Sequence, residues 1–153
     1  MELSERILGG FYKRDAIHTK SVQRIGKGTV RVTYQFPSYH RTVEDMGHVG
    51  MSQMNEALVE GLYCAIGYAI ESGDVQGKMD IASYTRRMAQ ALFMSQNISF
   101  RKMLKPGEEA QLTIEVVGIQ EKMRGKYYAV TLRVQGFMRG EVECWLSKDE
   151  VVF

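Results

Sequence analysis

Hydrophobic and polar positions recur with two different periods along the chain, and each period predicts one kind of element. In Thr29–Phe36 (TVRVTYQF) apolar side chains occupy every second position, which is typical of a strand with one buried face. In Gly47–Ile70 (GHVGMSQMNEALVEGLYCAIGYAI) the first turns are polar, and Gly61–Ile70 carries no charge. A helix that is apolar all round must be covered on every side, so we expect this one to be buried.

The remaining segments predict a short helix before the first strand and a series of antiparallel strands after the long helix. The expected elements are a helix at Leu3–Leu8, a hairpin over Val22–Phe36 with its turn at Gly26–Gly28, a small helix within Ile81–Leu92, and strands at Phe93–Lys102, Gln111–Lys122, Lys126–Met138 and Glu141–Lys148. The last three strands are joined by predicted turns at Arg124–Gly125 and Arg139–Gly140.

This order of elements predicts an α+β fold in which a curved antiparallel sheet wraps around one long helix, the hotdog arrangement. No internal repeat and no Pro/Gly/Ser-rich linker interrupts the chain, so residues 1–153 are expected to form one domain. A sheet curled around a single helix leaves an edge strand and an apolar face open. We therefore expect a homodimer or a higher homo-oligomer.

Composition excludes several classes of partner. The 20 Lys and Arg nearly balance the 18 Asp and Glu, and no basic run is interleaved with aromatic residues, so a nucleic-acid surface is not expected. The opening residues MELSERILGG lack a basic leader and a long apolar run, and the apolar part of the long helix is too short for a membrane span. We expect a cytoplasmic protein. Cys64 and Cys144 lack the spacing of a zinc or redox site, so they are predicted core residues, and no metal or bound cofactor is expected.

Three motifs follow one another along the chain: Tyr39 and Arg41 before Gly47-His48, then Ile81 with Tyr84, then the run from Ser99 to Pro106. In this order and spacing they resemble the FcoT-type long-chain acyl-CoA thioesterases, a branch of the hotdog superfamily, and the similarity runs from Tyr12 to Pro106. Glu44 with Gly47-His48-Val49 is similar to the acidic-x-x-Gly-His-Val segment of other hotdog thioesterases. Asn55-Glu56-Ala57 followed by Glu60 is similar to the Glu-Ala-x-x-Gln helix of hotdog dehydratases that act on acyl carrier protein.

The resemblance implies a substrate whose acyl chain is linked as a thioester to coenzyme A or to a carrier protein and lies in a tunnel at a dimer interface. The implied reaction is hydrolysis, or alternatively the addition of glycine or water to an enoyl thioester. By position, Tyr12 and Tyr39 match the tyrosines that hold the hydrolytic water in the family. Gly50 stands where the family has an asparagine, which departs from that pattern. A non-catalytic, acyl-binding hotdog subunit is the remaining alternative.

The residues themselves indicate where acyl-transfer chemistry would take place. The free N–H groups at a helix start suit a developing oxyanion, and Gly50 and Met51 are placed to supply them. Glu56 is the leading candidate for the general base, because burial would favour its protonated form near neutral pH. Alternatively, Glu56 and Glu60 form a solvated strip, or pair with an arginine such as Arg101.

Other polar residues are candidates for supporting roles. His48 is expected to orient water or to act as a base, with a turn histidine bonded to the backbone as the alternative. His18 and His40 are predicted surface residues. Arg101 and Lys102 suit the phosphates of coenzyme A or phosphopantetheine, although a solvated loop of mixed charge explains Lys102 equally well. The expected substrate-binding residues are Arg41, Asn55, Glu60, Tyr84, Arg101 and Lys102.

Overall fold

The computed structural model describes residues 2–36, 49–75 and 79–148, and its elements follow the predicted order. The helices are α1 (Leu3–Gly9), α2 (Met51–Glu71) and α3 (Ile81–Arg87), with 3₁₀ turns at Arg14–Ala16 and Met88–Gln90. The strands are β1 (Thr19–Gly26), β2 (Thr29–Gln35), β3 (Leu92–Phe100), β4 (Glu109–Lys122), β5 (Tyr127–Gly136) and β6 (Met138–Ser147). Within the described residues, no helix is both long enough and apolar enough to cross a bilayer.

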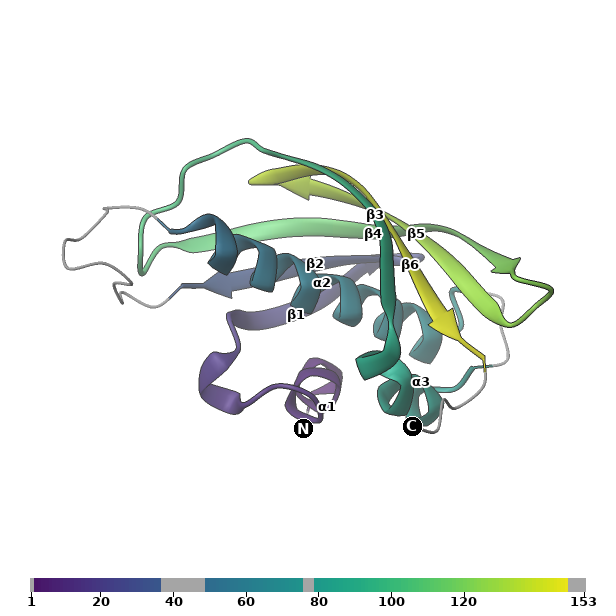
Figure 1. The fold of residues 1–153 in the computed structure, drawn as a ribbon. Coiled ribbons are helices and arrows are strands. Elements are labelled where there is room, and N and C mark those ends of the chain that lie inside the picture. Colours follow the sequence, from purple (N-terminus) through teal and green to yellow (C-terminus); the bar gives the residue numbers. More distant parts are fainter. Residues whose placement is uncertain (1, 37–48, 76–78, 149–153) are drawn as a thin grey trace.

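One antiparallel sheet of six strands arches over α2, as the sequence predicts (Figure 1). The strands are arranged in the order β1-β2-β4-β5-β6-β3, so β1 and β3 form the two edges. Helices α1 and α3 lie on the side of α2 away from the sheet (Figure 1). The long helix is therefore covered from both sides over its apolar half, which agrees with its uncharged sequence.

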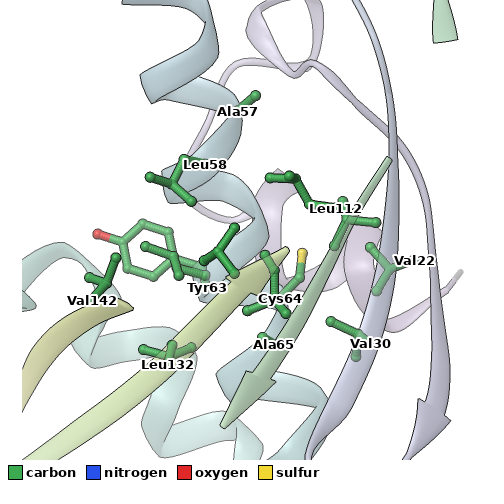
Figure 2. Packing of buried hydrophobic residues seen from close by; sticks show 14 of the residues in the cluster. Val22, Val30, Ala57, Leu58, Tyr63, Cys64, Ala65, Leu112, Leu132 and Val142 are labelled. Carbon is green, nitrogen blue, oxygen red and sulfur yellow. The ribbon is translucent and has the colours of Figure 1, made fainter. Parts of the chain in front are cut away.

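The core fills the space between α2 and the concave face of the sheet (Figure 2). In β2 the side chains of Val30, Val32 and Tyr34 are buried and those of Arg31 and Gln35 are exposed, which confirms the predicted alternation. The labelled residues of Figure 2 come from α2 and from five strands, and they are Val22, Val30, Ala57, Leu58, Tyr63, Cys64, Ala65, Leu112, Leu132 and Val142. Both cysteines are free and buried, in agreement with the sequence prediction.

A glycine allows the sheet to approach α2 closely near the middle of the helix. A Cβ atom at Gly61 would lie 2.2 Å from the hydroxyl oxygen of Tyr34 and 2.7 Å from Cδ1 of Ile114. No larger side chain fits there unless the Tyr34 and Ile114 side chains shift. Glycine at position 61 lowers the helix propensity, but it permits the close contact between α2 and the sheet.

The predicted turn at Arg139–Gly140 is wrong, because the chain reverses two residues earlier, at Phe137. β5 ends at Gly136, β6 begins at Met138, and the Phe137 side chain between them is buried against the Tyr34 ring, with 5.9 Å between ring centroids. Gly140 lies inside β6 with φ of 152°, where a Cβ atom would lie 1.9 Å from the carbonyl oxygen of Asn97. The close approach of β3, and not a turn, explains this glycine.

Candidate active site

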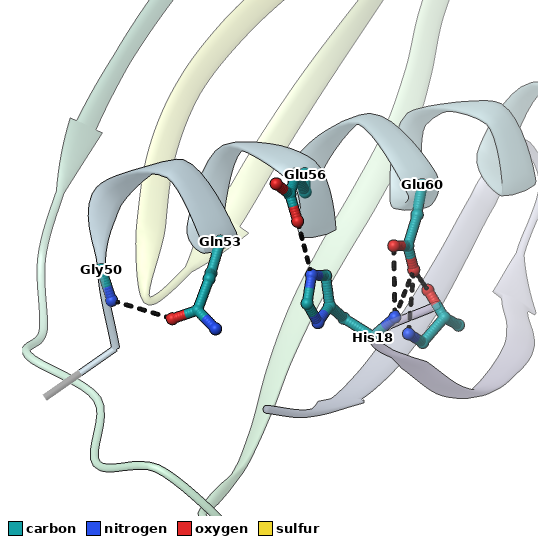
Figure 3. Close-up of polar contacts among 6 residues, drawn as sticks. His18, Gly50, Gln53, Glu56 and Glu60 are labelled. Atoms are coloured by element: carbon teal, nitrogen blue, oxygen red, sulfur yellow. Dashed lines mark hydrogen bonds and ion pairs between the residues drawn. The ribbon is translucent and has the colours of Figure 1, made fainter. Parts of the chain in front are cut away.

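A row of polar side chains follows one flank of α2 near its start (Figure 3). Gln53, Glu56 and Glu60 are three and four residues apart, so they share one face of the helix. This face lies against the segment that leads into β1, where His18 and Thr19 stand (Figure 3). The row therefore joins two parts of the chain that are about forty residues apart.

Glu60 is the buried carboxylate of the row, with 1% of its surface exposed. It accepts hydrogen bonds from the backbone N–H of His18 at 3.0 and 3.2 Å, from the N–H of Thr19 at 2.9 Å and from the Thr19 hydroxyl at 2.7 Å. Burial raises the pKa of Glu60, and this effect outweighs the hydrogen bonds from Thr19 and His18, which lower it. Glu60 thus anchors the segment before β1 to the long helix.

The second carboxylate, Glu56, contacts the imidazole ring of His18. The distance between His18 Nε2 and Glu56 Oε2 is 2.8 Å, with the carboxylate as acceptor (Figure 3). The histidine is 6% exposed and packs beside the ring of Phe36, whereas the Glu56 side chain is 58% exposed. One carboxylate oxygen is therefore held by a buried histidine while the group as a whole stays open to solvent.

Two sequence predictions on this flank are wrong. His18 is buried and not a surface residue, because Glu60 binds its backbone and draws the segment inward. Glu56 was expected to be buried, but it is Glu60 that is buried. The carboxylates do not form a solvated strip together, since Glu56 contacts the His18 ring and Glu60 accepts hydrogen bonds from Thr19.

The start of α2 is closed by a hydrogen bond that the side chain of its third residue, Gln53, accepts. Gly50 caps the helix with an extended backbone, and its N–H donates to Gln53 Oε1 at 3.1 Å (Figure 3). The predicted oxyanion donor at Gly50 therefore already has an acceptor within the protein. Met51, the first helical residue, has no intrahelical acceptor for its N–H and has a largely exposed side chain. Asn55, next to Glu56 in the sequence, is also exposed.

A groove of about 420 Å³ lies beside the start of α2, on the other flank of the helix. Its apolar lining comes from the helix and from the end of β3, and Arg101 and Lys102 add two cationic side chains. The complete lining is Val49, Met51, Met54, Phe100, Arg101, Lys102 and Met103, which we call the methionine groove. Because successive helical residues are rotated by about 100°, Met54 and Glu56 point about 160° apart. Within one chain, Arg101 and Lys102 therefore do not lie beside Glu56.

Two tyrosines that the sequence singles out, Tyr12 and Tyr84, both lie near Tyr63 of α2. Tyr12 is half-buried between the rings of Phe11 and Tyr63, at centroid distances of 4.8 and 6.5 Å. Burial raises the pKa of Tyr12, and the neighbouring Tyr63 and Glu60 raise it further. Tyr84 is fully buried, and its hydroxyl donates to the carbonyl oxygen of Tyr63 at 2.6 Å. Its hydroxyl is thus used to hold α3 against α2.

Three predicted site residues, Tyr39, Arg41 and His48, lie outside the described residues. Sequence reasoning missed two others, His18 and Gln53. Nothing in the pattern around His18 indicates burial, but a glutamine at the third helical position is a known capping signal and could have indicated Gln53. Among the residues that the structure describes, no cluster of three or more His, Cys, Asp or Glu side chains could hold a metal ion.

Comparison with known proteins rests on structure alone, since no family model and no curated protein matches the sequence. The dehydratase heterocomplex of Xenorhabdus doucetiae matches with a TM-score of 0.61 at 9% identity, over 95% of this chain and 91% of that chain. The chain has the hotdog fold. A sigma28-regulated virulence protein from Campylobacter jejuni matches with a TM-score of 0.53 at 13% identity, over 99% and 100% of the two chains. A thioesterase superfamily protein from Shewanella loihica gives a TM-score of 0.47 at 13% identity, over 81% and 87%.

Proposed function

We propose that this chain hydrolyses a fatty acyl thioester of coenzyme A or acyl carrier protein, with Glu56 as the general base. The observation that carries the proposal is the 2.8 Å contact between His18 Nε2 and Glu56 Oε2. A buried histidine fixes one oxygen of the carboxylate, and the exposed remainder is available to a water molecule. This arrangement of a base oriented by a second group is common in enzymes that activate water.

In the proposed reaction a water molecule donates a hydrogen bond to the free oxygen of Glu56. As its oxygen attacks the thioester carbonyl carbon, Glu56 takes the proton, and the carbonyl electrons move to the oxygen to form an oxyanion. The positive end of the α2 dipole favours this negative charge. When the carbon–sulfur bond breaks, the electron pair of the oxyanion reforms the carbonyl and the thiolate leaves with the proton from Glu56.

The methionine groove supports a substrate with an anionic carrier. Arg101, in its lining, offers the fork of donors that phosphates prefer. Lys102 lies 3.2 Å from Glu108, so this lysine is partly neutralised in the free protein. Since the groove and Glu56 lie on opposite flanks of α2, we assign Arg101 and Lys102 to the carrier and not to the reacting carbonyl.

A second reaction keeps the same base. The dehydratase heterocomplex shares this fold, and a dehydratase-type site moves water across a carbon–carbon double bond. Glu56 would then deliver water or glycine to an enoyl thioester. The sequence resemblance to FcoT-type thioesterases favours hydrolysis, and membership of that branch remains a prediction.

The direct test compares Glu56→Gln with Glu71→Gln, the same substitution at the other, exposed end of α2. Free thiol release is measured with acyl-CoA and acyl-carrier substrates, and the enoyl substrates are assayed with and without glycine. Glu56→Gln is expected to lower kcat about 100- to 10,000-fold with the fold retained, whereas Glu71→Gln keeps the wild-type rate. An unchanged rate in Glu56→Gln would remove Glu56 from the mechanism. Bound acyl-CoA with no turnover of any substrate would favour the acyl-binding subunit.

A further inference from the structure

The side-chain amide of Gln53 is a buried donor without an acceptor. The residue is 7% exposed, and no atom of the described part of the chain accepts a hydrogen bond from its Nε2. The orientation of the amide is fixed, because Oε1 accepts from the N–H of Gly50 at 3.1 Å. Leaving such a donor unpaired destabilises the folded protein, so the presence of Gln53 here requires a physical reason.

The place of Gln53 indicates what the donor faces. It stands one helical turn before Glu56 on the same flank of α2, at a rise of about 4.5 Å along the axis. Figure 3 shows the amide on the side of the helix where His18 lies, between the helix start and the carboxylate. A carbonyl group that receives water from Glu56 would lie on the same flank as this donor, near the positive end of the helix dipole, and it would displace the atoms that enclose Nε2 in the free protein.

We infer that Gln53 is a catalytic residue whose Nε2 donates a hydrogen bond to the carbonyl oxygen of the bound thioester. This inference rests on the proposed function. The N–H of Gly50, predicted from the sequence to serve this purpose, is already bonded to the oxygen of the same amide. Gln53 therefore closes the helix start with one end and offers the other end to the substrate. No bond to Gln53 forms or breaks, and its hydrogen bond strengthens as the carbonyl oxygen becomes an oxyanion.

The test uses two non-hydrolysable analogues of palmitoyl-CoA that differ only near the carbonyl. In one, a methylene group replaces the thioester sulfur and the carbonyl is kept. In the other, a thioether, a methylene group replaces the carbonyl. Calorimetry gives the ratio of their affinities for the wild-type protein, for Gln53→Met, which removes the amide at similar volume, and for Gln23→Met, an exposed control on β1.

The wild-type protein and Gln23→Met are expected to bind the carbonyl analogue about tenfold more tightly than the thioether, and Gln53→Met to bind both alike. Turnover of palmitoyl-CoA by Gln53→Met is expected to fall about 100-fold in kcat with little change in KM. If Gln53→Met does not fold, Gln53→Glu keeps an oxygen for Gly50 while lacking the donor, and it should lose the discrimination in the same way. Discrimination that survives in a folded Gln53 variant overturns the inference and leaves a buried water as the partner of Nε2.

The two proposals fail in different ways. A wild-type protein that discriminates between the analogues through Gln53 but releases no thiol contradicts the hydrolase and keeps Gln53 as a carbonyl-binding residue. A hydrolase whose Gln53 variants discriminate like the wild type contradicts only the role of Gln53. A protein that binds neither analogue contradicts both proposals.

Discussion

Two carboxylates of the same type, one helical turn apart, have different environments in this protein. The sequence shows that Glu56 and Glu60 stand on one face, but their burial depends on the segment before β1, which is remote in sequence. Helical spacing therefore predicts that the two carboxylates share a face. It does not indicate that Glu60 is buried against the segment before β1 while Glu56 stays exposed. The backbone N–H groups of His18 and Thr19 decide which carboxylate is buried, because both donate to Glu60.

The raised pKa of Glu60 predicts how the stability of the protein depends on pH. Its pKa in the unfolded chain is close to 4.5, and burial raises its pKa in the fold. Below 4.5 both states are protonated; above it the folded state binds more protons, so stability falls as pH rises until the folded pKa is passed. The slope from this one group is at most about 1.4 kcal/mol per pH unit.

Denaturant unfolding at a series of pH values, on the wild-type protein and on Glu60→Gln, measures this contribution. The difference in unfolding free energy between the two proteins should shift in favour of the wild type as pH falls toward 4.5. Since all other groups are common to both proteins, the comparison isolates Glu60. A constant difference across this range would show that the carboxylate ionises in the fold as it does in the unfolded chain.

At the scale of elements, α2 is the piece that the sequence predicts best. Its uncharged second half leads directly to a helix covered on both sides, and the alternation in β2 leads to the face that covers it. Turns are harder to predict, because a glycine can permit a close approach of two strands instead of a chain reversal. Gly140 in β6 permits such an approach. A sequence pattern indicates whether an element is a helix or a strand, but it does not indicate how closely the element packs against the next one.

The contact between α2 and β2 predicts a specific rescue. Gly61→Ala places a Cβ atom 2.2 Å from the Tyr34 hydroxyl and should destabilise the fold by about 1–3 kcal/mol. That hydroxyl is buried without a hydrogen-bond partner among the described residues, so Tyr34→Phe alone should be nearly neutral. The double variant should recover part of the loss, the rest being due to Ile114 Cδ1 at 2.7 Å.

Thermal or chemical unfolding of the four proteins forms a double-mutant cycle for this contact. A favourable coupling energy of about 1 kcal/mol is expected between the two substitutions. Additive effects would mean that β2 moves away from the helix and that the hydroxyl does not limit the approach.

For the whole molecule, the order of elements was enough to predict one curved sheet around one helix. The arrangement of the candidate site is harder to predict from the sequence, because it depends on packing between segments that are far apart along the chain. The segment before β1 carries His18 to the helix, and the methionine groove forms where the end of β3 meets the helix start. Neither contact leaves a periodic signal in the sequence.

The two edges of the sheet differ in a way that predicts how two copies of the chain associate. β1 carries exposed Lys20 and Arg24, and charged side chains on an edge discourage pairing. β3 has no charged residue, pairs with β6 alone among the described strands, and exposes the large apolar side chains of Leu92, Met94 and Phe100. We therefore predict a homodimer that pairs β3 with β3 of the second copy.

The substitution Met94→Lys places a charge on this edge and should weaken dimerisation at least about tenfold. Met123→Lys is the matched control, because Met123 is similarly exposed but lies in the turn between β4 and β5. Sedimentation equilibrium over a range of protein concentrations measures both variants and the wild type. Dimerisation weakened only by Met94→Lys supports pairing through β3, since an exposed lysine elsewhere leaves the assembly unchanged. A wild-type monomer at high concentration, or a dimer that tolerates Met94→Lys, would show that the uncharged edge is not the interface.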